Sequence, residues 1–243
     1  MNISNRKNIN IEESKITVIG FGRSGEGAAL LGHYLGANMF ISDGGSTDTM
    51  VESGKKLEAF GIQIETGGHT EKIYNTDLWV VSPGIAQDAE IVLNAKAKSI
   101  PIVSEIEFAS WFTDAPIISL TGSNGKTTSV HLLNKMCQTE SLSPALSGNV
   151  GTAFSEIVLA DLKDKPVNRI HVLEISSFQM EHIVHFKPLI SVFLNIAPDH
   201  LDRYANMDDY IQAKLSMIKN QNGTDHIIYN FDDPILKTKF DRS

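Results

Sequence analysis

The stretch Ile117-Ile118-Ser119-Leu120-Thr121-Gly122-Ser123-Asn124-Gly125-Lys126-Thr127-Thr128 predicts the centre of an α/β fold. Its first part is a short apolar, β-branched run, which is typical of a strand, and a helical pattern of apolar residues follows directly. A glycine-containing loop between a strand and a helix can direct backbone N–H groups at phosphate oxygens, and the helix dipole also favours an anion there. The sequence therefore predicts a phosphate-binding loop.

Two side chains of this loop carry its chemistry. Lys126 can reach the β- and γ-phosphates of a nucleotide, and the Thr127 hydroxyl can bind Mg²⁺. The strict pattern G-x-x-x-x-G-K-[ST] requires glycine where this chain has Leu120, so the loop is a variant. A chance Gly-Lys-Thr in a surface turn is the alternative interpretation, but the elements stand in the required order. The residues expected to bind ATP are Gly122, Ser123, Asn124, Gly125, Lys126, Thr127 and Thr128.

Composition limits the classes of partner. The 243 residues suffice for two ordinary domains, and 42% hydrophobic with 21% charged residues is a globular balance. A formal net charge of −8 offers no basic surface for a nucleic-acid backbone, so we expect a small phosphate ligand. The single cysteine, Cys137, excludes an internal disulfide. Because neither a long apolar run nor a secretion signal is present, we expect a cytoplasmic protein without a membrane span.

A second phosphate motif lies near the N-terminus. Gly20-Phe21-Gly22-Arg23-Ser24-Gly25 is a complete G-x-G-x-x-G between an expected strand at Lys15–Ile19 and an expected helix. The next strand ends at Asp43, about 20 residues further on, where dinucleotide-binding folds place a ribose-binding acid. The motif alone does not identify the nucleotide. A generic βαβ turn and a nicotinamide or flavin cofactor both remain open.

Strands alternate with helical patterns as far as residue 103, which predicts a parallel sheet with ligands beyond the carboxyl ends of its strands. Gly22, Asp43 and the segment Ser82-Pro83-Gly84-Ile85 all fall at such ends. We expect a flexible lead-in at 1–14, a Rossmann-like domain at 15–112, and a P-loop NTPase-like domain at 113–243.

In the second part, polar residues again follow apolar strands. Glu174 ends the strand Ile170–Leu173, where a carboxylate can hold Mg²⁺, although a helix-capping glutamate is the alternative. His200 follows the strand Leu189–Leu194, which we expect to be central, and its acidic and basic neighbours favour a metal or phosphate role over a structural one. We interpret the charged stretch Asp161–Pro166 as a solvated loop.

A helix from Asp208 places Tyr210, Lys214 and Met217 on one stripe, so Lys214 faces partly inward. Burial disfavours the charged form of a lysine, and a neutral amine can react with CO₂ to give a carbamate, which is a carboxylate on a long arm suited to a second Mg²⁺. From these residues alone, snorkelling of the ammonium to the surface is the better interpretation.

Taken together, the motifs resemble those of the Mur ligases, ATP-dependent amide ligases of peptidoglycan synthesis. The resemblance runs from about residue 15 to the last residue, and the first two motifs favour the branch that adds D-glutamate. Another branch and the folylpolyglutamate synthases are weaker matches. The matching segments are Gly20–Gly25, Ser82–Ile85, Thr121–Thr128, Gly148–Gly151, Glu174–Gln179, Asn195–Tyr204 and Tyr210–Leu215.

The resemblance implies a role for each matching residue, and it assigns the first domain to the UDP part of a substrate rather than to NAD. The implied substrate-binding residues are Arg23, Ser24 and Asp43 at UDP, Asn149, Ser176 and Gln179 at the muramoyl portion, and Ser82 and Gly84. The implied ligands of two Mg²⁺ ions are Thr127, Glu174, His200 and Lys214 as a carbamate. Lys126, His200 and Lys214 would be the catalytic residues.

The implied reaction joins D-glutamate to UDP-MurNAc-L-alanine through an acyl phosphate, with release of ADP and phosphate, in the bacterial cytoplasm and by a monomer. Family members are close to twice this length, so this chain would contain an incomplete central domain and no C-terminal domain. Gly44 and Gly45, after Asp43, bring no side chain to a uracil pocket. Two other hypotheses are a binding-only fragment and an NAD-dependent oxidoreductase with an incidental Gly-Lys-Thr loop.

Overall fold

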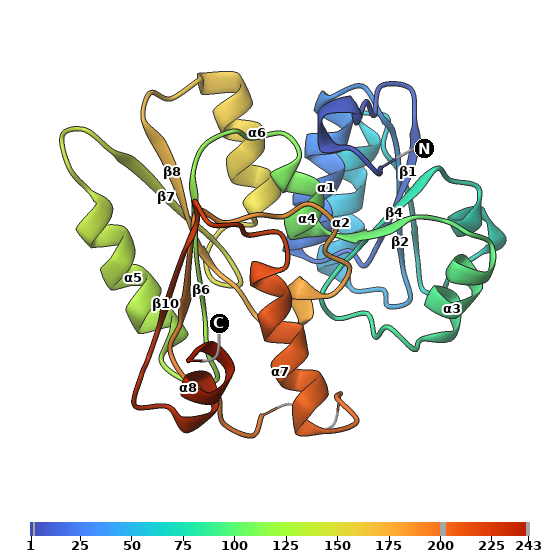
Figure 1. The fold of residues 1–243 in the computed structure, drawn as a ribbon. Coiled ribbons are helices and arrows are strands. Elements are labelled where there is room, and N and C mark those ends of the chain that lie inside the picture. The colour runs from blue at the N-terminus through green and yellow to red at the C-terminus, as the bar shows by residue number, and fades with distance from the viewer. Residues whose placement is uncertain (2, 200–202, 242–243) are drawn as a thin grey trace. The chain divides into compact units, whose positions relative to one another are not determined.

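The computed structural model describes residues 1, 3–199 and 203–241. They form two compact units, one of residues 1–112 with 154–163, and the other of 113–153 with 164–243 (Figure 1). Within the described residues each unit holds one five-stranded sheet, and every strand pair in both sheets is parallel. The predicted α/β fold with parallel sheets is confirmed.

The first unit is built around a sheet with the strand order β3-β2-β1-β4-β5. Its elements are η1 Arg6–Asn8, β1 Lys15–Ile19, α1 Arg23–Tyr34, β2 Asn38–Asp43, α2 Asp48–Glu58, β3 Gln63–Thr66, η2 Glu71–Tyr74, β4 Leu78–Val81, α3 Glu90–Ala97, β5 Ile102–Ser104 and α4 Glu105–Ser110, together with α6 Phe154–Asp164 from later in the chain. The lead-in is attached to this unit, because Ile11 is buried and the Glu13 N–H donates to the Gly36 carbonyl.

The G-x-G-x-x-G motif forms the junction between β1 and α1. A Cβ added at Gly25 would overlap the Gly20 carbonyl oxygen, so only glycine lets the helix start this close to the strand end. Gly20 itself lies beside Ser82 at the end of β4, and the Ser82 hydroxyl donates to the Gly20 carbonyl over 3.2 Å. The carboxyl ends of the neighbouring strands β1 and β4 therefore meet at this motif.

The second unit has the strand order β10-β9-β6-β8-β7, so the quoted stretch forms its central strand. Its elements are β6 Ile117–Thr121, α5 Lys126–Cys137, β7 Ser143–Gly148, β8 Arg169–Glu174, η3 Phe178–Met180, β9 Ile190–Phe193, α7 Met207–Leu215, η4 Ser216–Ile218, β10 His226–Tyr229 and α8 Pro234–Phe240. β9, expected to be central, is an interior strand that pairs with β6 on one side and with β10 on the other. The middle strand of the sheet is β6.

The expected loop at Asp161–Pro166 is wrong in its first part. Helix α6 continues to Asp164, because Phe154 and Val158 lie one turn apart and are both buried. Lys163 and Asp164 are therefore the exposed end of an amphipathic helix.

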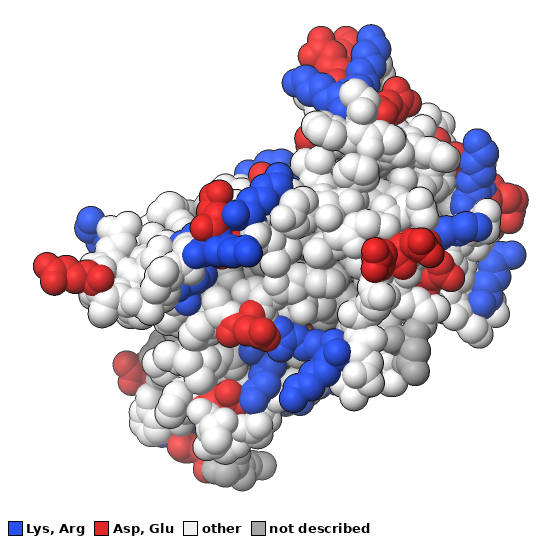
Figure 2. Space-filling model, turned by 90° about the horizontal axis from the view of Figure 1, so that it is seen from above, with Lys and Arg blue, Asp and Glu red and all other residues white. Residues whose placement is uncertain are grey.

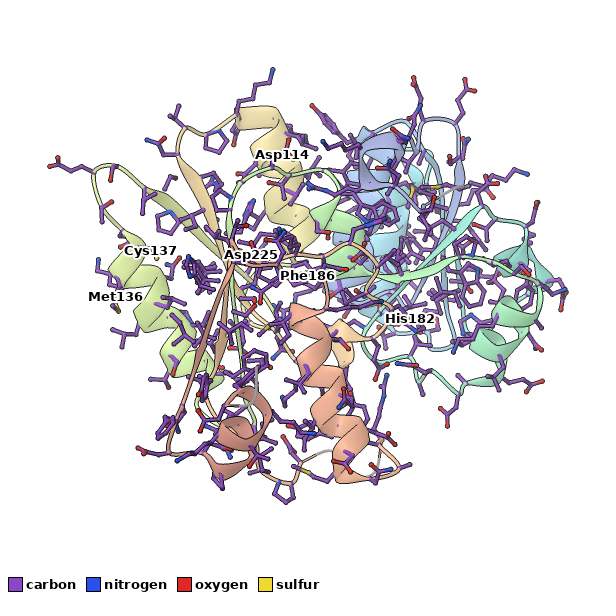
Figure 3. All side chains as sticks on the ribbon, viewed as in Figure 1. Asp114, Met136, Cys137, His182, Phe186 and Asp225 are labelled. Atoms are coloured by element: carbon purple, nitrogen blue, oxygen red, sulfur yellow. The ribbon has the colours of Figure 1, made fainter. Side chains whose placement is uncertain are left out.

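Helix α5 covers the second sheet with one face only. Val130 is buried and Cys137 packs against the cluster of Leu120, Val130 and Val172. The neighbouring Met136 is 68% exposed, and Figure 3 shows it on the side of the helix away from the sheet. The spacing of Val130, Leu133 and Met136 predicts one buried face, which is correct for Val130 and, in part, for Leu133, but wrong for Met136.

Charged side chains are dispersed rather than gathered. On the face drawn in Figure 2, acidic and basic side chains stand in small adjacent groups separated by uncharged surface. In the part of the chain that the structure describes, every helix is too short or too polar to cross a bilayer.

One buried carboxyl group anchors α6 in the first unit. Glu105 is 2% exposed, and its Oε1 accepts the Ser155 N–H over 2.6 Å at the first turn of α6. Burial raises the pKa of Glu105 from 4.5 to about 7, although the hydrogen bonds from Ser155 lower it in part.

We expect Glu105 to make the first unit less stable as the pH rises. Because the pKa is higher in the folded than in the unfolded chain, the folded state binds the extra proton between pH 4.5 and about 7. The free energy of unfolding should fall across this window by an amount on the order of 3 kcal/mol. Denaturant unfolding of Glu105→Gln should lose this part of the pH dependence, whereas Glu58→Gln on exposed α2 should keep it. Parallel pH profiles for wild type and Glu105→Gln would contradict this account.

Candidate active site

The loop between β6 and α5 is held in shape by Asn195, which follows β9. The Asn195 side-chain oxygen accepts the N–H groups of Ser123 and Asn124 over 3.1 and 2.8 Å, and its Nδ2 donates to the Asn124 carbonyl over 3.0 Å. The Ser123 N–H also donates to the Asn195 carbonyl. The first half of the loop is thus tied to the neighbouring strand.

The second half of the loop presents unused backbone donors. Gly125 has a left-handed conformation with φ of 78° and starts α5 without a side-chain cap. Among the described residues, no acceptor is found for the N–H groups of Gly125, Lys126, Thr127 and Thr128. Such orphan N–H groups at a helix N-terminus form an anion site. Of the seven residues expected at ATP, these four offer their N–H groups, whereas those of Ser123 and Asn124 are occupied by Asn195.

Lys126 and Lys214 meet at this loop. The Lys126 ammonium donates to the carbonyls of Gly122 and Ser123, both over 2.9 Å. The Lys214 ammonium, from α7, donates to the same Gly122 carbonyl over 3.0 Å. The structure therefore brings together two lysine side chains that are 88 residues apart in sequence.

Lys214 is buried, as the helical stripe predicted. It is 2% exposed, and its ammonium lies 4.7 Å from the centre of the Tyr210 ring. Burial lowers the pKa of Lys214 from 10.5 to about 7, and the positive charge of Lys126 lowers it further, while Asp199 acts in the opposite direction. At neutral pH a large share of Lys214 is therefore an uncharged amine, and the snorkelling alternative is wrong.

Glu174 ends β8 beside the start of the loop, because it pairs with Leu120 in the sheet register. Its Oε1 accepts the Asn149 side-chain N–H over 2.8 Å. Its Oε2 is buried and has no hydrogen-bond partner among the described residues, in a side chain that is 1% exposed. A buried carboxylate oxygen is normally paired or bound to a metal, so this unpaired oxygen fits a hard cation such as Mg²⁺.

Other predicted ligands are less defined. Thr127 is exposed at the start of α5, so its hydroxyl is free to reach a ligand. His200 lies outside the described residues. Within them no three His, Cys, Asp or Glu side chains gather as a metal cluster.

Ser176 and Gln179, which were expected to bind substrate, bond to each other, since the Gln179 Oε1 accepts the Ser176 N–H over 3.0 Å.

The predicted residues of the first unit lie around the end of β1. Asp43 Oδ2 accepts the Phe21 N–H over 2.6 Å and Oδ1 accepts the Gly45 N–H over 2.7 Å. Asp43 therefore shapes the glycine loop itself. Arg23 and Ser24 form the first turn of α1, and Gly84 lies in the turn after Ser82. These residues lie at one edge of the first sheet, the edge where its parallel strands have their carboxyl ends.

A second set of contacts was not predicted. The Ser123 hydroxyl accepts the Ala197 N–H over 2.9 Å and lies 3.0 Å from the Tyr210 hydroxyl. Asn195 and Tyr210 are thus the residues that hold the loop, and sequence reasoning assigned neither this role. The only signal was their place within matching motifs, because their partners lie more than 70 residues away.

Comparison with known families agrees with this arrangement. Residues 120–243 match the family model described as Mur ligase middle domain, and residues 15–91 match MurD N-terminal domain. The UDP-N-acetylmuramoylalanine--D-glutamate ligase of Chlorobium chlorochromatii is 40% identical over 240 residues, which are 97% of this chain and 50% of that protein. The ligase of the same name from Bacteroides fragilis is 40% identical over 230 residues, 94% of this chain and 50% of that protein.

The chain spans about half the length of these curated relatives. Among solved structures, UDP-N-acetylmuramate:L-alanyl-gamma-D-glutamyl-meso-diaminopimelate ligase from Neisseria meningitides matches with a TM-score of 0.64 and 17% identity, over 95% of this chain and 75% of that one. That likeness is one of fold. Since the Mur ligase middle domain alone matches residues 120–243, and an N-terminal domain of the same family precedes it, the chain belongs to the Mur ligase family.

Proposed function

We propose that this chain is part of an ATP-dependent ligase that joins D-glutamate to UDP-N-acetylmuramoyl-L-alanine in the bacterial cytoplasm. Relatives at about 40% identity carry that name, and both matching domain models are of this family. The observation that carries the proposal is the meeting of the open N–H groups of Gly125–Thr128, Lys126 and Lys214 at one loop beside Glu174.

In this proposal the second unit binds ATP with its γ-phosphate at the loop. The terminal carboxylate of UDP-N-acetylmuramoyl-L-alanine attacks the γ-phosphorus, the bond to the ADP oxygen breaks, and an acyl phosphate forms. The D-glutamate amine then attacks the acyl carbon, phosphate leaves, and the amine loses a proton. Two anions must approach in the first step, so the Lys126 ammonium and the N–H groups of α5 lower the barrier by offsetting their repulsion.

Thr127, Glu174, Lys214 as a carbamate and His200 are the residues that would hold two Mg²⁺ ions. When bound, Mg²⁺ neutralises phosphate charge and so assists the approach of the carboxylate. Glu174 is suited to this task because one of its buried oxygens is unpaired among the described residues. We assign the first unit, with Arg23, Ser24, Asp43, Ser82 and Gly84, to the UDP portion, and Asn149, Ser176 and Gln179 to the muramoyl portion.

Carbamylation of Lys214 can be measured on this chain without turnover. We expect a protein-bound carbamate ¹³C signal when ¹³C-bicarbonate is added at neutral pH, because burial lowers the pKa of Lys214 to about 7 and so leaves a reactive, uncharged fraction of the amine there. Lys214→Ala should abolish the signal, and Lys219→Ala, which removes a neighbouring exposed lysine, should keep it. Absence of the signal in the wild type, or its persistence in Lys214→Ala, would remove the carbamate from the proposal.

Calorimetry separates the proposed function from its rivals. UDP-N-acetylmuramoyl-L-alanine and an ATP analogue with Mg²⁺ should each bind, and each should bind in the presence of the other, because they occupy different sites. Phosphate release with D-glutamate then distinguishes a working enzyme from a binding-only fragment. Tight binding of NAD with no heat from the UDP-linked substrate would instead support an oxidoreductase and contradict the proposal.

A further inference from the structure

One face of the first sheet carries a row of side chains that the proposed site does not use. Thr17 on β1 pairs with Phe40 on β2, and Phe40 pairs with Gln63 on β3. Residues opposite each other in adjacent strands point to the same face of a sheet. Lys15 and Asn38 form the next pair on this same face.

Helices α1 and α2 lie on the opposite face. Met39 and Ile41, which alternate with Phe40, are buried, and a Cβ at Gly32 of α1 would overlap the Met39 sulfur. On α2, a Cβ at Gly54 would meet Ile64 at 3.6 Å, on the strand next to Ile41. Phe40 therefore points away from both helices, toward the side where η2 lies.

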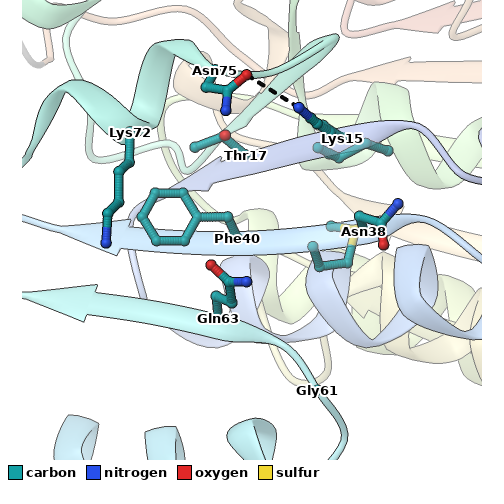
Figure 4. Close-up of a pocket in the computed structure, with 10 residues that line it drawn as sticks. Lys15, Thr17, Asn38, Phe40, Gly61, Gln63, Lys72 and Asn75 are labelled. Atoms are coloured by element: carbon teal, nitrogen blue, oxygen red, sulfur yellow. Dashed lines mark hydrogen bonds between the residues drawn. The ribbon is translucent and has the colours of Figure 1, made fainter.

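A cavity of about 460 Å³ occupies this side. Thr17, Phe40 and Gln63 line it together with Lys15, Lys72 and Asn75, and Figure 4 shows the Lys72 side chain extending past the Phe40 ring. This volume falls within the range of small-molecule pockets. The aromatic ring provides an apolar surface, and amide groups surround it.

The charges around the cavity are of one sign. None of the lining residues that the structure describes is an aspartate or glutamate, although the whole chain has a net charge of −8. The Lys15 ammonium donates to the Asn75 side-chain oxygen over 3.2 Å, and the Lys72 ammonium has neither a hydrogen bond nor an ion pair within the described ranges. A ligand with a negative group would complement these two lysines.

Thr17 places a hydrogen-bonding group in the cavity. Its side chain is deep in the sheet, with 2% of the residue exposed, and it lines the cavity. Only its backbone N–H has a side-chain partner, the Thr76 hydroxyl, whereas no partner for the Thr17 hydroxyl is present in the part of the chain described. Because this oxygen is not fully buried, it reaches the cavity and is available to a bound molecule.

We propose that this cavity binds a small planar aromatic molecule carrying one anionic group, a carboxylate or a phosphate, with the ring on Phe40 and the anion at Lys15 and Lys72. The Thr17 hydroxyl and the Gln63 and Asn75 amides would bond to polar atoms on the ring edge. The site lies on the face of β1–β3, apart from the carboxyl-edge residues assigned to UDP, and it does not depend on the proposed ligase function.

NMR titration of the ¹⁵N-labelled chain tests this site with phenyl phosphate and benzoate as probes. At least one of them should give saturable shifts at the amides of Thr17, Phe40 and Gln63. Inorganic phosphate, which lacks the ring, and benzyl alcohol, which lacks the charge, should bind there at least about 5-fold more weakly, because each loses one of the two contacts.

Matched variants identify the residues responsible. Lys72→Ala should lower the affinity for the aromatic anion by about 5-fold or more. Lys55→Ala, on exposed α2 at the opposite face of the sheet, should leave this affinity unchanged. Phe40→Leu should also lower the affinity for the aromatic anion. Thermal unfolding of this variant checks that it is folded. Absence of saturable shifts at these amides, or equal affinity in wild type and Lys72→Ala, would overturn the site. Because the probes report on the first sheet, a failure here leaves ATP binding at the second unit untouched.

Discussion

Replacing Lys126 by alanine is expected to weaken binding of the ATP analogue with Mg²⁺ by about 10- to 100-fold, the usual loss for a hydrogen bond to a charged group. The Lys126 ammonium donates hydrogen bonds to the carbonyls of Gly122 and Ser123, so it lies within the loop where the phosphates are proposed to bind. Fluorescence titration with a labelled analogue measures the effect, and phosphate release should be lost with it wherever the chain turns over.

Lys135→Ala is the matched control for this prediction. Lys135 is exposed on the same helix, and its ammonium bonds to the Gln138 side chain rather than to the loop. It should bind the analogue as the wild type does. If Lys126→Ala retains wild-type affinity, or if Lys135→Ala loses as much, the loop is not the nucleotide site.

Gly148→Ala should lower the free energy of unfolding by about 3 kcal/mol or more, the largest loss of stability expected here. Gly148 has φ of 103°, which alanine rarely adopts, and its added Cβ would overlap the Glu174 carbonyl oxygen. The substitution must therefore push apart the ends of β7 and β8, where Glu174 is delivered. Thermal unfolding should show a transition lowered by about 6 °C or more, given about 2–4 °C per kcal/mol at this chain length.

Gly151→Ala separates steric overlap from backbone strain. Gly151 also has a positive φ, 73°, but nothing lies within 4 Å of its added Cβ. The free energy of unfolding of Gly151→Ala should therefore fall only by the cost of the left-handed backbone conformation, about 1–2 kcal/mol. Equal destabilisation by the two substitutions would mean that the contact between Gly148 and Glu174 is not what fixes this end of the sheet.

Much of the fold is encoded in local patterns. The strand, loop and helix at 117–137 and the first βα unit at 15–34 were predicted because apolar periodicity and glycine spacing are properties of short segments. The inward direction of Lys214 was predicted for the same reason, since Tyr210 and Lys214 share one face of α7, Met217 follows them in η4, and all three are buried.

Long-range contacts explain what the sequence did not reveal. β7 contains Pro144, which a central strand would not tolerate, and only its position at the sheet edge makes it a strand. β10 exposes Ile227 and Ile228, so it lacks a buried pattern. The bond of Asn195 to the loop and the unpaired oxygen of Glu174 arise where separate strands meet, which no local pattern records.

The proposed convergence of metal and phosphate groups can be measured directly by paramagnetic broadening with Mn²⁺ and a non-hydrolysable ATP analogue. The proposed site predicts that the amide signals of Gly125–Thr128 and of Glu174–Ser176 broaden together, and more strongly than those of Ser143 and Arg169 at the opposite ends of β7 and β8. Broadening at Gly20–Gly25 with sharp signals from the loop and from Glu174 would contradict the proposed site.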